Sequence, residues 1–598
     1  MQLQWVLKYL IAVAFFSIVV KSAEIKGVDN AELLSLIKSQ ISDWKNFSEE
    51  AIANKFRLRK DEEVIKKLAD SFGYFDSEVT STIKNHKVTF SVKLNERYRF
   101  NDVLLIYTDQ RDYKYGLKVK QVFDLININY DSYTDSKQIA DGRERIEDFL
   151  KKQGFAFVRA ERPIIEFDRE SKKIKVTYNV ALSGKTIIDG TILNIKTKKN
   201  PKLIESFVKN RIPWKDGDVY NLQKIEDLKD KLMTSGIFSA IDVALSPPVP
   251  DSKDSKVCRA IITISVEEGK LREIEIGGRY GSSEKIGVLF SWAHYNIDGK
   301  GSKLSAVADI AKLEKNVKLK YDMYDLFYKE QNLANKVFYK KENVDAYNVS
   351  TVGAESVLWQ SFGKSFKIGA GGRYENSKTK DKLKAKSKKV NFKAFGIPIG
   401  INFDTTDSYL DPQKGIRCLG MATPYFGKPS NVTIVTGKAS LYIPIRKNAF
   451  KNAMVISMYT KIGSILRDKK RIMPRDKFFF AGGNNSVRGY GYQMLGEFNN
   501  KKKPYGGESL FEIGVEPRLR VSDDVGLVAF FEGGNVYSSN VPKPFKKMLF
   551  GYGGGVRYYT SIAPIRLDIA FPTKLRKTKK GKRVDSRFNL YISVGQAF

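Results

Sequence analysis

The sequence predicts two structural parts, small α+β repeats followed by an all-β, 16-stranded antiparallel transmembrane barrel. In the N-terminal part, a helix that ends in glycine and is followed by an aromatic-rich strand start recurs three times, with the glycines 81 and 82 residues apart. Beyond residue 269, apolar and polar residues alternate, which is typical of strands between lipid and a polar lumen. After the N-terminus, no apolar run reaches the ~18 residues that a membrane helix needs.

The N-terminal segment, residues 1–23, is predicted to be a secretory signal peptide. Lys8 precedes the apolar run Tyr9–Val20. A run of this length is too short to span a bilayer comfortably, but it suits the apolar region of a signal. We expect cleavage after Ser22 or Ala23, and an uncleaved amphipathic anchor is the alternative.

Three copies of one small domain are predicted next, at residues 24–96, 97–183 and 184–269. Apolar residues at helical spacing precede Gly73, Gly154 and Gly236, and each glycine supplies a left-handed helix exit. Two strands joined by a polar turn follow, as at 164–167 and 174–180. A small three-stranded sheet leaves a free edge, to which an extended client chain could add a strand. Unrelated α/β domains with similar turns are the alternative.

Residues 270–598 form the predicted barrel. At ~10 residues per strand plus turns and loops, sixteen strands fit, and an even number returns both barrel ends to one side of the membrane. The last strand alternates Phe588, Leu590, Ile592 and Val594 with more polar residues, and the chain stops at Phe598. A soluble sandwich is the alternative.

A glycine-rich segment at residues 478–492 is the strongest functional signal. It carries Val487, Arg488, Gly489 and Tyr490 between two alternating stretches. Glycine adopts conformations closed to other residues, and a desolvated arginine needs a partner. We therefore predict that the segment docks inside a polar lumen, and an arginine solvated at the surface is the alternative.

The turn Ala481–Gly483 followed by Ser486–Tyr490 resembles the sixth extracellular loop of the BamA/TamA superfamily of outer-membrane insertases. The repeats resemble the superfamily's periplasmic POTRA domains. Three repeats before one barrel are nearest to the TamA subfamily, because BamA typically has five and two-partner secretion transporters have two. The resemblance implies a bacterial outer-membrane protein with POTRA domains in the periplasm.

A second motif contains Asp407, Leu410, Asp411, Pro412 and Gly415. It resembles the family's periplasmic turn, in which proline and glycine shape a tight reversal. We assign it a structural role.

A third motif, Phe530, Glu532 and Gly534, resembles the family's F-x-D-x-G strand, with glutamate in place of the usual aspartate. In the family this strand faces the inserted arginine, so the resemblance implies a contact between Arg488 and Glu532. A charge-assisted contact of this kind would stabilise the loop by roughly 1.5–3 kcal/mol.

A lateral seam is predicted where the first barrel strand, about residues 271–282, meets the last, about residues 587–598. Glycine weakens a strand, and we assign the seam to six residues: Gly277, Gly278, Gly281, Ser593, Gly595 and Phe598. Our hypothesis is that the seam opens, so that a client strand pairs with the first strand and enters lipid without unsatisfied backbone groups. A cysteine pair at Gly278 and Ser593 is expected to lock it.

The chain is strongly basic, with a net charge of +36. In a cytosolic protein this charge would suggest nucleic acid, but here it is scattered and we expect no nucleic-acid partner. The densest runs, 378–389 and 574–583, are predicted to lie in extracellular loops. They either meet anionic lipid headgroups or reflect a biased genome composition.

Metal and enzyme functions are not expected. The two cysteines, Cys258 and Cys418, exclude a disulfide framework and leave one long-range bridge open. His86 and His294 are the only histidines, and the sequence lacks nucleotide-binding and nucleophile-elbow motifs. We expect no cofactor.

Three function classes remain. The first is an assembly factor that inserts unfolded β-barrel or autotransporter clients into the outer-membrane bilayer. The second is a two-partner-type secretion pore. The third is a lipid conduit that works with a TamB-like inner-membrane partner.

Overall fold

The computed structural model describes residues 23–42, 44, 52–84, 87–108, 125–126, 129–197, 201–252, 254, 256–281, 285–383, 389–446, 454–468, 470–560 and 564–594. Residues 1–22, most of the predicted signal peptide, lie outside these ranges. The chain divides into two compact units. The repeat unit comprises Met1–Asn194, Pro213–Lys229 and Asp242–Ile264, and the barrel unit comprises Ile195–Ile212, Asp230–Ile241 and Ser265–Phe598.

The first α/β copy has a mixed three-stranded sheet in the order β1-β3-β2, with β1 parallel to β3. Its elements are β1 (Ala23–Lys26), α2 (Ala31–Gln40), α3 (Ile52–Ser71), β2 (Glu78–Lys84) and β3 (Lys87–Lys93). Asn30 caps α2 by accepting from two backbone N–H groups of the first turn. Leu33, Ile37, Trp44 and Phe90 are fully buried in the core between helices and sheet.

The second copy is built around β7, which pairs with β4 in parallel and with β5 and β6 antiparallel. Its elements are β4 (Arg99–Tyr107), α5 (Ser136–Lys152), β5 (Arg159–Ala160), β6 (Ile164–Asp168) and β7 (Lys173–Ala181). The strands predicted at 164–167 and 174–180 are confirmed. Both β5 and β6 pair with β7, so this sheet gains a strand segment over the expected three.

The third copy is divided between the two units. Its elements are β8 (Lys185–Lys196), α6 (Pro201–Lys209), α7 (Leu222–Thr234), β9 (Phe238–Leu245), β10 (Val249–Pro250) and β11 (Val257–Glu268). Gly73, Gly154 and Gly236 have φ of +87°, +105° and +69°, so all three copies leave the helix through the left-handed conformation that the sequence predicts.

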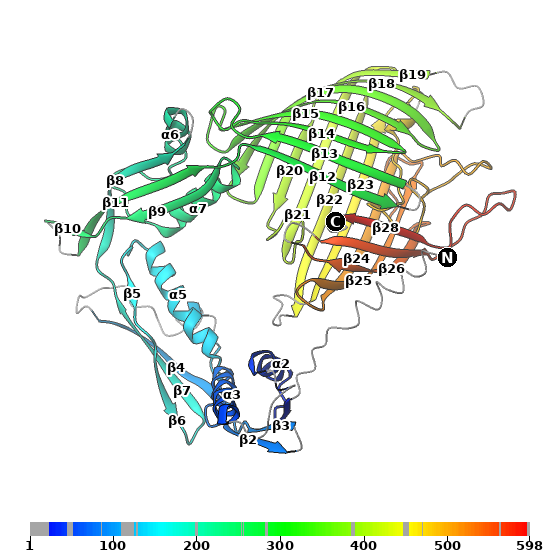
Figure 1. Cartoon of the computed structure of the whole chain (residues 1–598). Coiled ribbons are helices and arrows are strands. Elements are labelled where there is room, and N and C mark those ends of the chain that lie inside the picture. The colour runs from blue at the N-terminus through cyan, green and yellow to red at the C-terminus, as the bar shows by residue number, and fades with distance from the viewer. Residues whose placement is uncertain are drawn as a thin grey trace. The chain divides into compact units, whose positions relative to one another are not determined.

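The C-terminal part is a closed antiparallel barrel whose strands follow one another in sequence order from β12 to β28 (Figure 1). The first half comprises β12 (Arg272–Gly281), β13 (Lys285–His294), β14 (Lys303–Ala311), β15 (Glu314–Tyr324), β16 (Gln331–Asn343), β17 (Tyr347–Phe362), β18 (Phe366–Asp381), β19 (Lys389–Gly396) and β20 (Ile399–Asp404). The second half comprises β21 (Gly415–Lys428), β22 (Val432–Arg446), β23 (Met454–Arg467), β24 (Ser509–Arg520), β25 (Val525–Tyr537), β26 (Leu549–Tyr558), β27 (Ile565–Pro572) and β28 (Asn589–Val594).

The prediction of sixteen strands is confirmed, because β19 and β20 occupy one strand position. Both pair with β18 on one side and with β21 on the other. The break falls at Ile397 and Pro398, where proline cannot donate to the ladder.

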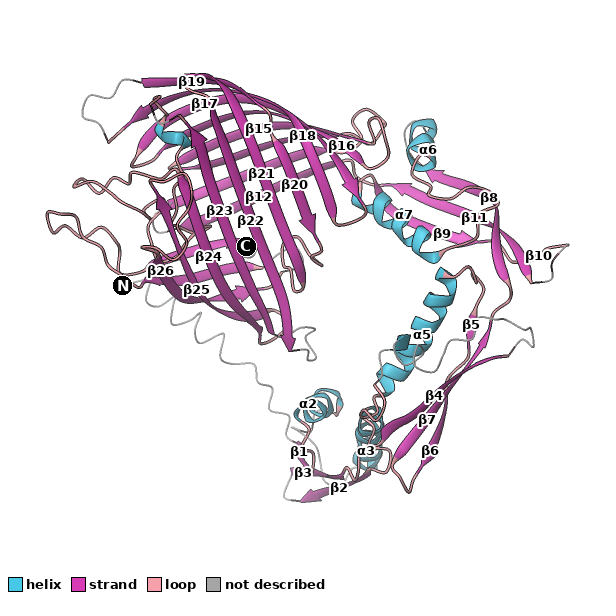
Figure 2. Cartoon of the chain, turned by 180° about the vertical axis from the view of Figure 1, so that it is seen from behind, coloured by secondary structure: helices cyan, strands magenta, loops and turns pink. Residues whose placement is uncertain are grey.

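Alternation sets the two faces of the wall. In β27, Ile565, Leu567 and Ile569 are exposed on the outer face, whereas Arg566 and Asp568 are buried on the lumen side. In the parts of the chain that the structure describes, helices of eight or more residues occur only before the first barrel strand, and Figure 2 labels them α2, α3, α5, α6 and α7. Among the described residues, no helix is both long enough and apolar enough to cross a membrane.

Candidate functional site

The connection between β23 and β24, residues 468–508, forms the strongest candidate site, and we name it the lumen loop. Where the structure describes this connection, the short 3-10 turn η1 (Arg475–Lys477) is its only helix or strand. Val487, Arg488 and Tyr490 are 0% exposed. The wall residues that contact Arg488 are buried, lumen-facing side chains of the strands, so this loop lies inside the barrel.

Arg488 is held by three carboxylates from three different strands. Its Nε and Nη2 donate to Glu532 Oε1 of β25 at 2.9 and 2.5 Å. Its Nη2 also donates to Glu516 Oε2 of β24 at 2.7 Å, and its Nη1 donates to Asp568 Oδ2 of β27 at 2.8 Å. The Arg488 backbone N–H donates to Glu532 Oε2 at 2.8 Å. Because a buried charge is stable only when it is paired, loop and wall stabilise each other.

An aromatic ring and two glycines complete the cradle around the loop. The Arg488 guanidinium lies 3.5 Å from the centre of the Phe530 ring, which adds a cation–π contact. A Cβ atom on Gly551 would lie 1.9 Å from the Arg488 carbonyl oxygen, and one on Gly534 would lie 3.0 Å from Val487 Cγ2. Only glycine at position 551 allows this close approach of loop backbone to the wall.

The lumen loop also contacts the last strand, β28. Asn589 Nδ2 donates to the Gly489 carbonyl at 2.8 Å, and the Tyr591 hydroxyl donates to the Tyr490 carbonyl at 3.4 Å. Gly489 has φ of +98°, and a Cβ atom there would lie 2.7 Å from the Phe571 carbonyl oxygen. The loop therefore holds β28 from the lumen side.

Further arginines extend the buried network. Arg518 Nε donates to Glu516 Oε1 at 2.9 Å, and Arg557 donates to Asp568 Oδ1. Arg557 and Arg566 lie directly opposite each other on β26 and β27. Glu516 and Asp568 thus each contact Arg488 and another arginine. The carboxylates between the arginines offset the repulsion between the neighbouring guanidinium groups.

The other arm of the lumen loop is anchored to β18 through η1. Three contacts join them: Lys477 with Glu375, Asp476 with Thr379, and Arg475 with Asp381 at 3.2 Å. The loop therefore spans the lumen between β18 and the β24–β27 wall.

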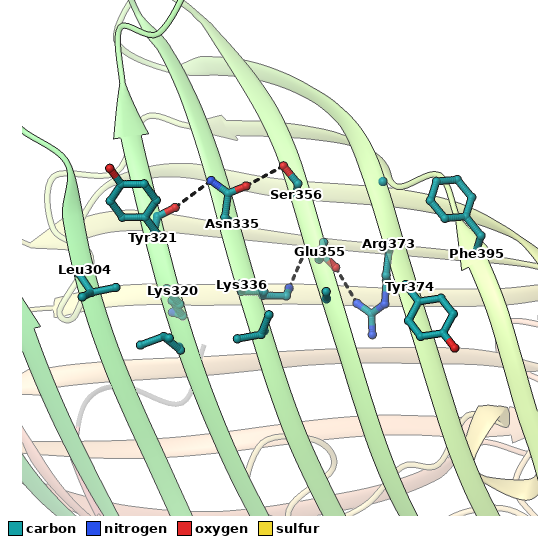
Figure 3. Close-up of a pocket in the computed structure, with 14 residues that line it drawn as sticks. Leu304, Lys320, Tyr321, Asn335, Lys336, Glu355, Ser356, Arg373, Tyr374 and Phe395 are labelled. Atoms are coloured by element: carbon teal, nitrogen blue, oxygen red, sulfur yellow. Dashed lines mark hydrogen bonds and ion pairs between the residues drawn. The ribbon is translucent and has the colours of Figure 1, made fainter. Parts of the chain in front are cut away.

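A row of charges crosses the strands β16 to β18 in the same half of the barrel as this second anchor. Lys336 Nζ donates to Glu355 Oε1 at 2.6 Å, and Arg373 Nη1 donates to Glu355 Oε2 at 2.7 Å (Figure 3). These side chains border a cavity of about 530 Å³ in the wall. Arg373 also contacts Glu375, so the row continues to the anchor of Lys477.

The seam between β12 and β28 is short. Only Tyr280 with Ile592 and Gly281 with Tyr591 are register partners within the described residues. Gly277 and Gly278 pair with β13, and Ser593 pairs with Arg566 of β27. Gly595 and Phe598 lie outside the described residues.

The observed register changes the expected crosslink across the seam. Extending it places Arg279, rather than Gly278, opposite Ser593. Because a one-residue offset turns side chains to opposite faces, the pair Gly278 and Ser593 is unsuitable. Tyr280 and Ile592 are opposite each other, and both are exposed on the outer face.

The predicted periplasmic turn connects β20 to β21. Asp407 Oδ1 accepts from the backbone N–H groups of Gln413 and Lys414 at 2.9 and 3.3 Å. Gly415 has φ of +107°, and a Cβ atom there would lie 2.5 Å from the Thr405 carbonyl oxygen. In the same turn, Leu410 is exposed, Pro412 is buried, and the Asp411 N–H donates to Ser408.

Cys258 and Cys418 are free. In the described parts of the chain, no group of three or more His, Cys, Asp or Glu side chains is placed to hold a metal ion.

The structure brings Arg488, Phe530 and Glu532 together, and it adds residues that sequence reasoning missed. The missed residues of the network are Asn484, Glu516, Arg518, Arg557, Arg566 and Asp568. For the five of these residues that lie on strands, the available signal was a charged residue at a lumen-facing position of an alternating strand. Polar residues are ordinary at such positions, so the signal does not single these out.

Comparisons with known proteins agree with this architecture. A family model described as the Omp85 superfamily domain matches residues 296–598, and the POTRA family, described as surface antigen variable number repeat, matches residues 117–181 and 191–269. A protein of Nitratidesulfovibrio vulgaris named outer membrane protein assembly factor BamA is 24% identical over 96% of this chain and 73% of its own length. The protein of the same name from Neorickettsia risticii is 19% identical over 86% of this chain and 69% of its own length.

Among solved structures, BamA from Haemophilus ducreyi lacking POTRA domains 1–3 superposes with a TM-score of 0.56. It is 16% identical, and the match covers 83% of this chain and all of that one, so it supports the fold alone. Fold and matches define an outer-membrane β-barrel protein with periplasmic POTRA domains. The chain belongs to the Omp85 superfamily.

Proposed function

We propose that this protein is an outer-membrane assembly factor that inserts β-rich client proteins through the seam between β12 and β28. Its membership of the Omp85 superfamily and the names of its relatives support this function class. The seam has two register pairs among the residues that the structure describes, and this observation carries the proposed mechanism. By comparison, β12 pairs with β13 at ten positions and β27 with β28 at six.

A short seam can open at low cost because few hydrogen bonds are lost. Once open, β12 exposes backbone donors and acceptors that a client strand can pair with, so no polar backbone group enters lipid unsatisfied. The barrel itself is then the template, and the free energy of client folding and lipid burial drives insertion.

The lumen loop supports the seam from inside. Its contacts with Asn589 and Tyr591 hold β28, and its contacts with Asp568 hold the neighbouring strand β27. When the seam opens, docking of Arg488 therefore favours separation of β12 while β28 remains paired with β27.

For the clients we propose β-barrel or autotransporter chains delivered along the POTRA edges, with a TamB-like inner-membrane protein as a partner. In the first copy β2 is an edge strand, and its free side offers backbone hydrogen bonds to an extended chain. An inventory of outer-membrane proteins after depletion of this protein tests the client class, and unchanged levels of β-barrel proteins and autotransporters would contradict it.

A disulfide across the seam tests the mechanism. Tyr280→Cys with Ile592→Cys joins register partners of the seam, and Val288→Cys with Ile310→Cys joins outward register partners of β13 and β14 as the matched control. After oxidation we expect the seam variant to lose client insertion and to regain it on reduction, while the control inserts normally. A two-partner-type pore would export its substrate through the lumen, so export that continues with an oxidised seam would favour that alternative.

A further inference from the structure

The connection between β27 and β28, residues 573–588, is the most charged segment of the barrel unit that remains unused by the proposed function. It contains eight lysine and arginine residues and one carboxylate, Asp585. Seven of its cations are exposed: Lys574, Lys577, Lys579, Lys580, Lys582, Arg583 and Arg587. We name this segment the basic hairpin; it is the red loop that extends from the barrel in Figure 1.

The basic hairpin is an ordered structure. Lys577 and Arg583 form a β-bridge, and the Thr578 N–H donates to the Lys582 carbonyl at 2.9 Å. The Gly581 N–H donates to the Thr578 carbonyl at 2.8 Å, and Gly581 has φ of +76°, as a tight turn requires. The exposed cations are therefore held close together, although like charges on neighbouring positions repel.

A buried ion pair clamps the base of the hairpin onto the lumen loop. Arg576 donates to Asp585 from Nε at 2.8 Å and from Nη2 at 2.7 Å. It also donates to the carbonyls of Met494 and Gly496 at 2.7 and 3.0 Å. This bidentate pair consumes the only carboxylate of the hairpin, so the exposed cations have no counter-charge within it.

Aromatic side chains on the outer wall indicate where the basic hairpin lies relative to the membrane surface. Tyr552 stacks on Phe571 at 5.7 Å between ring centres, and Phe571 lies 6.4 Å from Phe588. Phe571 and Phe588 flank the hairpin, one at each side of its base. Aromatic girdles of outer-membrane barrels mark the boundary between hydrocarbon and headgroups. The exposed cations begin directly beyond this boundary.

We propose that the basic hairpin binds the phosphate groups of anionic lipid headgroups in the leaflet at the extracellular end of the barrel. Position and charge complementarity carry the inference, because a cationic cluster at headgroup level meets lipid phosphates first. The hairpin connects to β28, so the bound lipid lies beside the seam. A client strand that leaves the seam would then meet a leaflet enriched in anionic lipid.

The test uses the full-length protein in mixed bilayers of phosphatidylglycerol and phosphatidylcholine. The lipids that remain bound after detergent extraction are counted by native mass spectrometry. We compare the wild type with Lys579→Gln/Lys580→Gln/Lys582→Gln. The matched control, Lys300→Gln/Lys329→Gln/Lys414→Gln, removes the same charge from exposed residues of turns at the opposite end of the barrel.

We expect the hairpin variant to lose enrichment in phosphatidylglycerol by at least about fivefold, whereas the control keeps most of it. Equal loss in both variants, or no loss in the hairpin variant, would overturn the proposal. Inorganic phosphate that displaces the lipid at a salt concentration where chloride does not would instead indicate a site for free phosphate. Preferential capture of a polyglutamate peptide would indicate an acidic protein partner. Either result would overturn the lipid assignment.

A second measurement does not depend on the variants. In the wild type, enrichment in phosphatidylglycerol is expected to fall as the salt concentration rises, because exposed charges are screened over about 8 Å at physiological ionic strength. Enrichment that is unchanged by salt would contradict a headgroup site, whatever the folding state of the variants. Heat-modifiable mobility in gels confirms that each variant has formed its barrel.

Discussion

At the residue scale, Arg488 determines how the loop and the wall fit together. Its guanidinium is fully buried and contacts Glu516, Glu532 and Asp568, which come from different strands. Breaking a buried network by removing one partner leaves the remaining charges unpaired, which costs more than the network contributes relative to apolar residues. Removing the whole Arg488 side chain should therefore destabilise the docked conformation more than the loss of any one of its hydrogen bonds.

Arg488→Ala is predicted to release the lumen loop. Loss of the guanidinium leaves Glu532 buried without its ion-pair partner, beside Glu516 and Asp568, and we expect a destabilisation of the docked state by about 3–5 kcal/mol. Protease cleavage within residues 468–508 should become faster, and client assembly should fall while the barrel still inserts. The control is Arg488→Lys, which keeps the charge but not the forked geometry, and should be intermediate. Wild-type protease resistance in Arg488→Ala would refute the docking role.

Gly551→Ala is predicted to displace the same loop without changing any charge. The new Cβ would lie 1.9 Å from the Arg488 carbonyl oxygen, so the loop backbone must move away. In the same strand, Gly554→Ala meets its nearest neighbour, the Val528 carbonyl oxygen, at 3.2 Å and serves as the control. Loop proteolysis should increase only in Gly551→Ala. Equal rates in the two variants would show that the wall at β26 does not restrict the loop.

How much of this site could be predicted is clear from Glu532 and Asp568. Glu532 lies in a motif that resembles a family pattern, and its contact with Arg488 was implied by that resemblance. Asp568 lies 80 residues from Arg488 in sequence and belongs to no motif, and its contact depends on the strand register. Register depends on pairing between strands and cannot be read from one strand's own alternation.

At the scale of elements, the strand pairs differ most in the length of their registers. β17 and β18 pair at sixteen positions, whereas β12 and β28 share two within the described residues. Glycine at positions 277, 278 and 281 adds no side-chain packing to β12. The seam is therefore the part of the described wall with the least backbone pairing.

Amide exchange in β12 is predicted to be faster than in β17. In residues 272–279 of β12, the amide groups on the side of β28 have no described partner strand. They can therefore exchange without the loss of a ladder hydrogen bond. Hydrogen–deuterium exchange of the protein in lipid nanodiscs, read for peptides covering 272–281 and 347–362, measures the difference. The oxidised seam disulfide should slow exchange in β12 only. Similar protection of both strands in the wild type would contradict a weak seam.

A second element-scale contact joins the first and second α/β copies. Tyr98 and Lys172 donate to Asp76 at 2.7 and 2.9 Å, and the hydrogen bond from Lys172 is the main reason why the pKa of Asp76 is lowered. A carboxyl group with a lowered folded pKa stabilises the folded state above its unfolded pKa of about 4. This contribution is lost as the pH falls through the lowered value.

Asp76→Asn is therefore predicted to weaken the junction of the two copies at pH 6 and to match the wild type below the lowered pKa. The rate of proteolysis between the first two copies, measured as the pH is lowered from 6 through the acidic range, tests this. Glu78→Gln removes the same charge from an exposed pair with Lys93 and should leave the pH profile unchanged. An identical pH profile for Asp76→Asn and the wild type would show that Asp76 does not stabilise the junction.

Strand prediction from alternation worked where one face was uniformly apolar, as in β27, and less well elsewhere. The strands β13 to β18 were counted from length alone. Their lumen faces carry lysines such as Lys318 and Lys320 beside Val317 and Leu319, so the alternation is present but mixed with charge. The basic run at 378–389 was expected in a loop, but β18 continues to Asp381, because Ser377 and Thr379 pack inside the barrel.

At the scale of the whole molecule, the barrel determines how the chain behaves in solution. Its outer face exposes rows of Ile, Leu, Val, Phe and Tyr side chains, which require lipid or detergent. We predict that the mature chain is extracted only by detergent and migrates faster on gels before heating than after. A soluble species without heat-modifiable mobility would overturn the membrane assignment.

The convergence of three strands on Arg488 has a consequence for the protein's own biogenesis. Before the guanidinium arrives, the wall pairs Glu516 with Arg518 and Asp568 with Arg557, but it buries Glu532 of β25 beside them without a described ion-pair partner, which opposes closure of the barrel. Entry of the loop before the strands have closed would remove this cost. In a newly made copy, its arrival would act as a checkpoint for maturation.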